Sequence, residues 1–269
     1  MGGKTSYSNS FSYFNCRDFI NFCRTFFNKT LAFTLAETLI VMGIIGVVAA
    51  LTLPNLNSST GEKEKVAKVK KIYSNLQDAF GRAEAVYGPF DEWFSNYNSS
   101  VNASKMAGER ITEFMKLSKN CELATNTGCW TNKKFNKMDN TQDSDSISIS
   151  DDASLYKSIL ADGTSISFSC SGFECIIDID IDIDGPNKGP FAYNRDIFEF
   201  GVYDDGILPV YTYYNNAPPT GNYSKSQCNE AAYCTDWIIY NDNMDYLKAD
   251  INGKCNGVQL NWTNQTTCK

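Results

Sequence analysis

One uncharged apolar segment near the N-terminus constrains this chain more than any other feature of its sequence. The stretch from Leu39 to Leu53 contains a single Thr and no charged side chain, and its apolar character begins at Phe33. A helix over residues 33–53 rises roughly 30 Å at about 1.5 Å per residue, which matches the hydrocarbon core of a bilayer. No later stretch of the sequence is as long and as apolar. We therefore expect one transmembrane helix, at residues 33–54.

Composition excludes several classes of protein. Asp+Glu number 31 against 24 Lys+Arg, and a net charge of -7 is unsuited to general binding of nucleic acid. The chain has 0 His, which removes the commonest general base and every Ser-His or Cys-His nucleophile pair. A hydrolase with two carboxylates stays open by composition, but no such pair stands out from the acidic background. We therefore expect a protein that is not an enzyme.

An acidic residue lies inside the expected membrane span. A carboxylate such as Glu37 is costly in lipid unless it is paired or protonated. Neither a secretory signal peptide cut after Ala50 nor an ordinary membrane anchor accounts for it. The segment from Lys29 to Val41, KTLAFTLAETLIV, together with the apolar run up to Pro54, resembles the prepilin-type cleavage and methylation segment. Type IV pilins and type II secretion pseudopilins carry this segment.

The resemblance implies how the chain is processed. In that family the prepilin peptidase cuts before a Phe and methylates the new amino terminus. Here the cut falls between Ala32 and Phe33, so residues 1–32 form a leader. Glu37 then becomes the fifth residue of the mature chain, and Pro54, a helix-kink position, becomes the twenty-second. Ala32 stands where the family usually has Gly.

The resemblance also implies a mode of assembly. The Phe33 amino group and the Glu37 carboxylate are each costly in lipid, and pairing between neighbouring subunits neutralises both. The implied function is a structural subunit of a type IV pilus-like or type II secretion pseudopilus filament. The implied partners are the prepilin peptidase, other pilin or pseudopilin subunits, an inner-membrane assembly platform and the lipid bilayer. The implied location is the bacterial inner membrane, crossed once, with the C-terminal head outside the cytoplasm.

The cysteines fit an oxidising compartment. Ten Cys occur, and none forms the C-x-x-C pair that is typical of zinc ribbons and thioredoxin-like sites. Cys16 and Cys23 lie in the leader and are expected to stay reduced or to be discarded. Nearest-neighbour disulfides are the simplest connectivity for the others. The candidates are Cys121, Cys129, Cys170, Cys175, Cys228, Cys234, Cys255 and Cys268.

Helical periodicity returns after a polar stretch at residues 55–61. Ser59 and Glu62 form a capping box, and Gly88-Pro89 marks an end. We therefore expect an amphipathic spine helix within 55–88 that packs on a head formed by residues 89–269. Its apolar residues fall at steps of three and four: Val66, Val69, Ile72, Tyr73, Leu76, Phe80 and Ala83.

The head has the patterns of β-structure. Residues 156–160 and 164–169 flank Asp162-Gly163, and residues 197–203 and 207–211 flank Asp205-Gly206, so we expect two hairpins. Residues 175–184 alternate apolar and acidic side chains, which predicts a strand with one buried and one solvent-facing side. The expected fold class is α+β, pilin-like, with a long N-terminal helix on an antiparallel sheet.

Two features leave binding functions open. Alternating aspartates before a Gly-Pro turn offer hard oxygen ligands for Ca²⁺, with Asp184 and Asn187 the best candidates. The distal Glu of an EF-hand is missing, and a solvated strand face explains the same pattern. The tail from Cys228 to Cys268 is rich in Asn, Tyr and Trp, which suits glycan stacking, a subunit interface or ordinary amphipathic surface. The alternative function is therefore a membrane-anchored extracytoplasmic binding protein, for instance for glycans.

Overall fold

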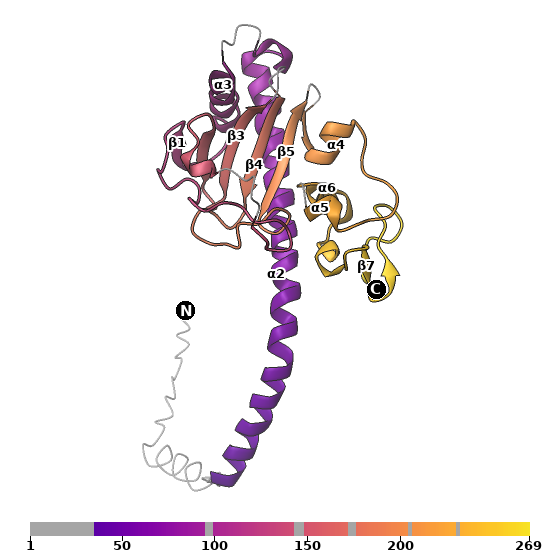
Figure 1. Ribbon diagram of the computed structural model, residues 1–269. Coiled ribbons are helices and arrows are strands. Elements are labelled where there is room, and N and C mark those ends of the chain that lie inside the picture. The colour runs from indigo at the N-terminus through magenta and orange to yellow at the C-terminus, as the bar shows by residue number, and fades with distance from the viewer. Residues whose placement is uncertain (1–34, 95–98, 143–147, 172–175, 204–205, 230–231) are drawn as a thin grey trace, which may run out of the picture. The chain divides into compact units, whose positions relative to one another are not determined.

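The computed structural model describes residues 35–94, 99–142, 148–171, 176–203, 206–229 and 232–269, with only the helical backbone described at 49–60. The chain divides into two compact units, residues 1–56 and residues 57–269. The second unit has an α+β fold, in agreement with the class expected from the sequence. Its centre is an antiparallel sheet of six strands (Figure 1).

Helix α2 runs from Leu35 to Tyr87 without interruption. The helix start expected at Ser59 is therefore wrong, since residues 55–61 continue the helix. Extending an existing helix adds one hydrogen bond per residue, whereas a new helix must first form a costly nucleus. The expected end is confirmed. Gly88 has a φ of 86° and donates its backbone N–H to the Glu84 carbonyl at 2.9 Å, and Pro89 follows.

The sheet is a meander in which spatial order follows chain order. Each strand pairs antiparallel with its neighbour in the sequence. This order requires no crossover connection. The strands are β1 (Leu117–Glu122), β2 (Tyr156–Leu160), β3 (Ser165–Ser171), β4 (Ile176–Asp182), β5 (Ile197–Tyr203) and β6 (Gly206–Pro209).

The apolar stripe of α2 packs on one face of this sheet, as the periodicity predicts. Ile72 and Leu76 have no exposed surface and share a core cluster with Ile179 of β4. The ring of Tyr73 is half-buried and stacks on Phe200 at a centroid distance of 5.4 Å. The face of β3, β4 and β5 toward α2 is therefore the centre of the core (Figure 1).

Helix α2 also supplies hydrogen bonds to the edge of the sheet. The Gln77 side-chain amide donates to the Ile207 carbonyl at 2.6 Å, and its oxygen accepts from the Ile207 N–H at 3.2 Å. Because β6 is the last of the described strands in this sheet, none of them pairs with Ile207 on that side. Gln77 therefore takes the place of a backbone partner.

The first expected hairpin is confirmed, and the second is shorter than expected. Strands β2 and β3 enclose Asp162 and Gly163, where Gly163 has a φ of 88°. Strand β6 ends at Pro209 instead of continuing to residue 211, because helix α4 (Val210–Asn215) begins there. Pro209 has a φ of -59° and no backbone N–H, so it ends a strand readily and precedes a helix well.

A second helix, α3 (Ser100–Thr112), contributes to the same core. Its N-terminus is capped by Ser99, whose hydroxyl accepts from the Asn102 N–H at 3.3 Å. Gly108 faces the Tyr156 ring so closely that a β-carbon added at Gly108 would lie 2.2 Å from the ring. The remaining elements are short: η1 (Phe90–Glu92), η2 (Ile149–Asp151), α5 (Ser226–Asn229), α6 (Cys234–Asn241), η3 (Asp245–Lys248), β7 (Lys254–Cys255) and β8 (Val258–Gln259).

Two glycines give a matched test of this packing. Gly108→Ala should lower the free energy of unfolding by about 1 to 3 kcal/mol, because the added methyl overlaps the Tyr156 ring. Gly81→Ala, in an exposed part of α2 with nothing within 4 Å, should raise it by up to about 1 kcal/mol. Chemical denaturation of the detergent-solubilised chain measures both. Equal effects of the two substitutions would contradict the close approach of α3 to β2.

Candidate functional site

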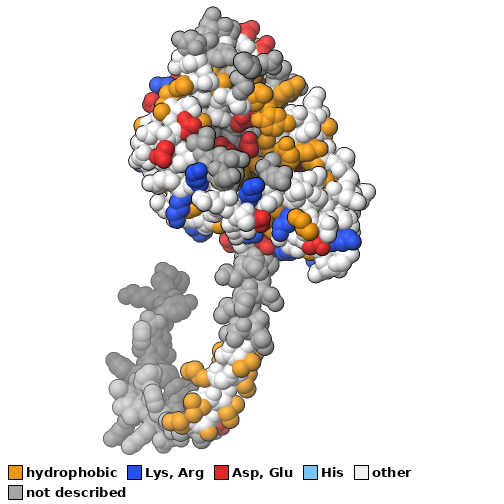
Figure 2. Space-filling model, in the orientation of Figure 1, with side chains coloured by type: hydrophobic (Ala, Val, Ile, Leu, Met, Phe, Trp, Pro, Cys, Tyr) orange, Lys and Arg blue, Asp and Glu red, His pale blue; other side chains and the backbone are white. Residues whose placement is uncertain are grey.

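The first segment of α2 exposes apolar side chains around its whole circumference. Its large side chains range from 51% exposed at Val41 to 78% exposed at Leu35, and Figure 2 shows hydrophobic groups along this segment. Exposed apolar surface of this extent is typical of segments that contact lipid or other proteins. The exposed residues are Leu35, Leu39, Ile40, Val41, Met42, Ile44, Ile45, Val47 and Val48.

In the part of the chain that the structure describes, no helix is both long enough and apolar enough to cross a membrane.

Glu37 lies in the first turn of this helix and is exposed. A carboxylate is favourable there, because the helix dipole places partial positive charge at the N-terminus. The next residue, Thr38, donates its hydroxyl to the Leu35 carbonyl at 2.9 Å. Ala32 and Phe33 lie outside the described residues, so their cleavage and the pairing with Glu37 stay predictions. Pro54 lies within α2, where only the backbone is described.

Three disulfides join cysteines that are neighbours in the sequence. They are Cys121–Cys129, Cys228–Cys234 and Cys255–Cys268, which is the simplest pairing expected for them. Cys170 is also disulfide-bonded, whereas Cys175 lies outside the described residues.

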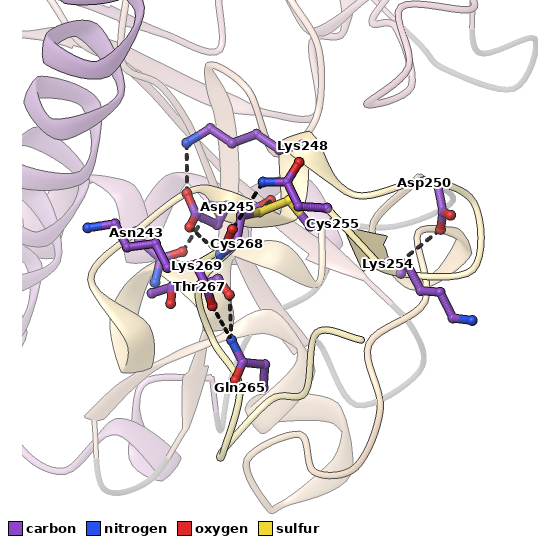
Figure 3. Close-up of a disulfide and its surroundings, with 12 residues drawn as sticks. Asn243, Asp245, Lys248, Asp250, Lys254, Cys255, Gln265, Thr267, Cys268 and Lys269 are labelled. Carbon is purple, nitrogen blue, oxygen red and sulfur yellow. Dashed lines mark hydrogen bonds and ion pairs between the residues drawn. A yellow bond between two sulfur atoms is a disulfide. The ribbon is translucent and has the colours of Figure 1, made fainter. Parts of the chain in front are cut away.

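The last of these disulfides is part of a larger clamp on the C-terminus (Figure 3). Asp245 accepts a hydrogen bond from the Cys268 N–H at 2.8 Å and pairs with Lys248 at 2.7 Å. The same Lys248 ammonium pairs with Glu62 of α2 at 2.8 Å. The end of the chain is therefore tied both to η3 and to the spine helix.

The two candidate calcium ligands lie in positively charged surroundings. Asp184 pairs with Lys65 at 3.3 Å and with Lys188 at 3.2 Å. Asn187 lines a surface pocket of about 440 Å³ together with Lys133 and Lys134. Among the residues described, no group of three or more Cys, Asp or Glu could hold a metal ion. These surroundings give no support to a calcium site at Asp184 or Asn187.

Protein-family models, curated proteins and solved structures contain no match to this chain. Its own residues are therefore the basis for assigning a function.

Three aromatic residues of the tail, Trp237, Tyr246 and Trp262, form a small core with Tyr223, which precedes the tail, whereas Tyr240 of the tail is 46% exposed. Tyr223, Trp237, Tyr246 and Trp262 are each at most 3% exposed. The rings of Trp237 and Trp262 meet at 4.9 Å, and Tyr223 packs against both. None of these four residues offers a ring face to a glycan.

The acidic side of β4 is not solvent-facing, so that part of the strand prediction is wrong. Asp178 is 7% exposed and Asp182 is fully buried, while Asp180 is half-buried. Alternation tells which side chains share a face, but not what covers that face. Here Tyr214 of α4 reaches over it and donates its hydroxyl to Asp178 at 3.2 Å.

Burial changes the protonation of these carboxyl groups. It raises the pKa of Asp180 to about 7 and that of Asp182 to about 8, with nearby Asp178 and Asp196 adding to the respective shifts. One oxygen of Asp182 accepts from the backbone N–H groups of Asp184 and Gly185, both at 3.1 Å. The cause of both shifts is mainly desolvation, which disfavours the charged form.

These shifts predict that stability falls as pH rises. An unfolded Asp loses its proton near pH 4, whereas folded Asp182 keeps it up to about pH 8, so unfolding releases a proton in this window. Asp182→Asn retains an acceptor oxygen and cannot ionise. We expect the free energy of unfolding, measured by denaturation, to fall between about pH 5 and about pH 8.5. The fall should be smaller in this variant than in the native chain by at least about 1 kcal/mol.

Asp139 provides the matched control for this experiment. Hydrogen bonds from Thr141 lower the pKa of Asp139, so its stabilisation is present above about pH 4 and is the same at both test conditions. Asp139→Asn should therefore lower stability without changing the difference between the two pH values. An unchanged difference in Asp182→Asn would show that Asp182 does not titrate in this window.

Removing the C-terminal disulfide tests the clamp. Replacing Cys255 and Cys268 by Ser should lower the free energy of unfolding by about 2 to 4 kcal/mol under oxidising conditions. Replacing Cys16 and Cys23 by Ser, both in the expected leader, should leave the stability of the mature chain unchanged. Equal stability of the two double variants would indicate that the Cys255–Cys268 bond contributes nothing.

Proposed function

We propose that this chain is a structural subunit of a type IV pilus-like or type II secretion pseudopilus filament. The observation that carries the proposal is the exposed apolar segment of α2 with Glu37 in its first turn. Between residues 35 and 60 this is the sole charged residue. Before assembly the bacterial inner membrane covers the segment, and after assembly the helices of neighbouring subunits cover it.

Glu37 favours assembly over simple anchoring. The helix dipole offsets part of the cost of a carboxylate at this position, but transfer of the carboxylate into lipid still calls for a cationic partner or a proton. The amino group created by a cut before Phe33 is such a partner in the neighbouring subunit. Pairing the two charges also sets the axial offset between subunits, which a filament needs and a lone anchor does not.

The alternative of an anchored glycan-binding protein has less support. It depended on the aromatic tail, where Trp237, Tyr246 and Trp262 are buried and Tyr240 is exposed. Glu37 has no role in that alternative. We therefore retain the filament subunit as the function.

Processing is the first test of this proposal. In a host with a prepilin peptidase, the protein recovered from membranes should begin at an N-methylated Phe33, as determined by N-terminal sequencing and intact mass. A retained leader, or a cut after Ala50, would contradict the assignment and return the chain to an anchored or secreted protein.

Glu37 is the second test. Glu37→Ala should leave insertion and cleavage unchanged but reduce incorporation into filaments by more than about tenfold, because losing one partner of a buried ion pair costs about 3 to 5 kcal/mol. Glu64→Ala, an exposed acid further along α2, is the control and should assemble normally. The measurement is the amount of subunit that co-purifies with sheared filaments. Normal incorporation of Glu37→Ala would overturn the proposed role.

A further inference from the structure

Three tyrosines form an exposed group beside the acidic side of the sheet, and we call them the tyrosine patch: Tyr203 of β5 with Tyr213 and Tyr214 of α4. Tyr203 is 41% exposed and Tyr214 is 50% exposed. Tyr213 joins them, with ring centroids 6.1 Å from Tyr203 and 5.0 Å from Tyr214. Figure 2 shows hydrophobic side chains beside acidic ones on this face of the molecule.

The patch is seated directly on the sheet. A side chain at Gly201 of β5 would place its β-carbon 2.4 to 2.6 Å from ring atoms of Tyr213. Only glycine therefore allows the Tyr213 ring to lie on the strand at this point. The contact fixes the position of α4 and, with it, the ring of Tyr214.

Three carboxyl groups adjoin the patch. Asp180 of β4 is the direct cross-strand partner of Glu199 of β5, and Asp178 is the partner of Gly201. Asp178 accepts hydrogen bonds from the Ser171 hydroxyl at 2.6 Å and from the Tyr214 hydroxyl at 3.2 Å. Asp180 and Glu199 are half-buried.

No cation within the described ranges neutralises this group. Asp178, Asp180 and Glu199 make no ion pair there, and the Glu199 carboxyl makes no hydrogen bond. Lys157 of β2 bonds to the Asp152 carbonyl instead. Burial raises the pKa of all three carboxyl groups, and repulsion by neighbouring acids adds to the shifts of Asp180 and Glu199. The pKa of Tyr214 is raised as well. The three carboxyl groups therefore attract a cation, and the described residues do not supply one.

We propose that the tyrosine patch and these three carboxyl groups bind a Lys or Arg side chain presented by a partner polypeptide. Ring faces attract a cation, and carboxylates form charge-assisted hydrogen bonds with an ammonium or guanidinium group. A bound cation relieves the repulsion among the acids, so binding displaces protons from them. This surface lies on the sheet and α4, so the proposal does not depend on the role of Glu37.

The test uses the full mature chain in detergent micelles and a fluorescent oligolysine peptide, with an oligoglutamate peptide of the same length as the control ligand. We expect binding of the oligolysine peptide only, tighter at about pH 8 than at about pH 6 because fewer protons remain to be displaced. Glu199→Gln and Tyr214→Ala should each weaken binding by about tenfold or more. Glu64→Gln removes the same formal charge elsewhere and should leave the affinity unchanged.

Several outcomes would overturn this proposal. If Glu64→Gln and Glu199→Gln weakened peptide binding equally, the affinity would depend on the overall charge of the chain and not on this site. Unchanged affinity in Glu199→Gln, with the fold verified by circular dichroism, would show that the carboxyl group is not involved. Self-association that is abolished by Tyr214→Ala and unaffected by the peptide would assign the surface to a second copy, and competition by Ca²⁺ or a neutral oligosaccharide would assign it to those ligands.

Discussion

Burial of one helical stripe against the sheet is the interaction on which the rest of this structure depends. Val69, Ile72 and Leu76 lose all of their exposed surface there, and each such side chain contributes about 1.5 to 3 kcal/mol. The polar flank of the same helix holds the chain between β4 and β5. Lys65 donates to the Arg195 carbonyl at 2.9 Å, and Lys68 donates to the Ile183 carbonyl. A single helix thus organises both the core and the connections of the sheet.

The two faces of the sheet are stabilised by different physics. The face toward α2 and α3 is apolar and gains stability from each buried side chain. The opposite face carries Asp178 and Asp182 in buried positions, where a charged carboxylate is expensive and a protonated one is tolerated. Buried acids depart from the usual apolar composition of a core, and such departures are typical of functional sites.

The sequence predicts those parts of the fold that follow from local pattern. The stripe of α2 has a clear period of 3.6, and the hairpin around Gly163 has a turn that only a few residues favour. Helix α3 is not predicted, because the role of its small residues depends on a tertiary contact, the packing of Gly108 against Tyr156. The site divides in the same way. Glu37 stands out within an apolar run, whereas Tyr214 and Glu199 come together only through strand pairing and the packing of α4.

The pairing of the cysteines has a consequence for biogenesis. Each of the three fully described disulfides closes a loop between consecutive cysteines, with sequence separations of 8, 6 and 13 residues. As the chain is synthesised, the correct partner of each of these six thiols is the next one to appear or the last one that did. An oxidase that joins thiols in order of emergence therefore produces these native bonds directly, and their formation needs no isomerase to rearrange mismatched pairs.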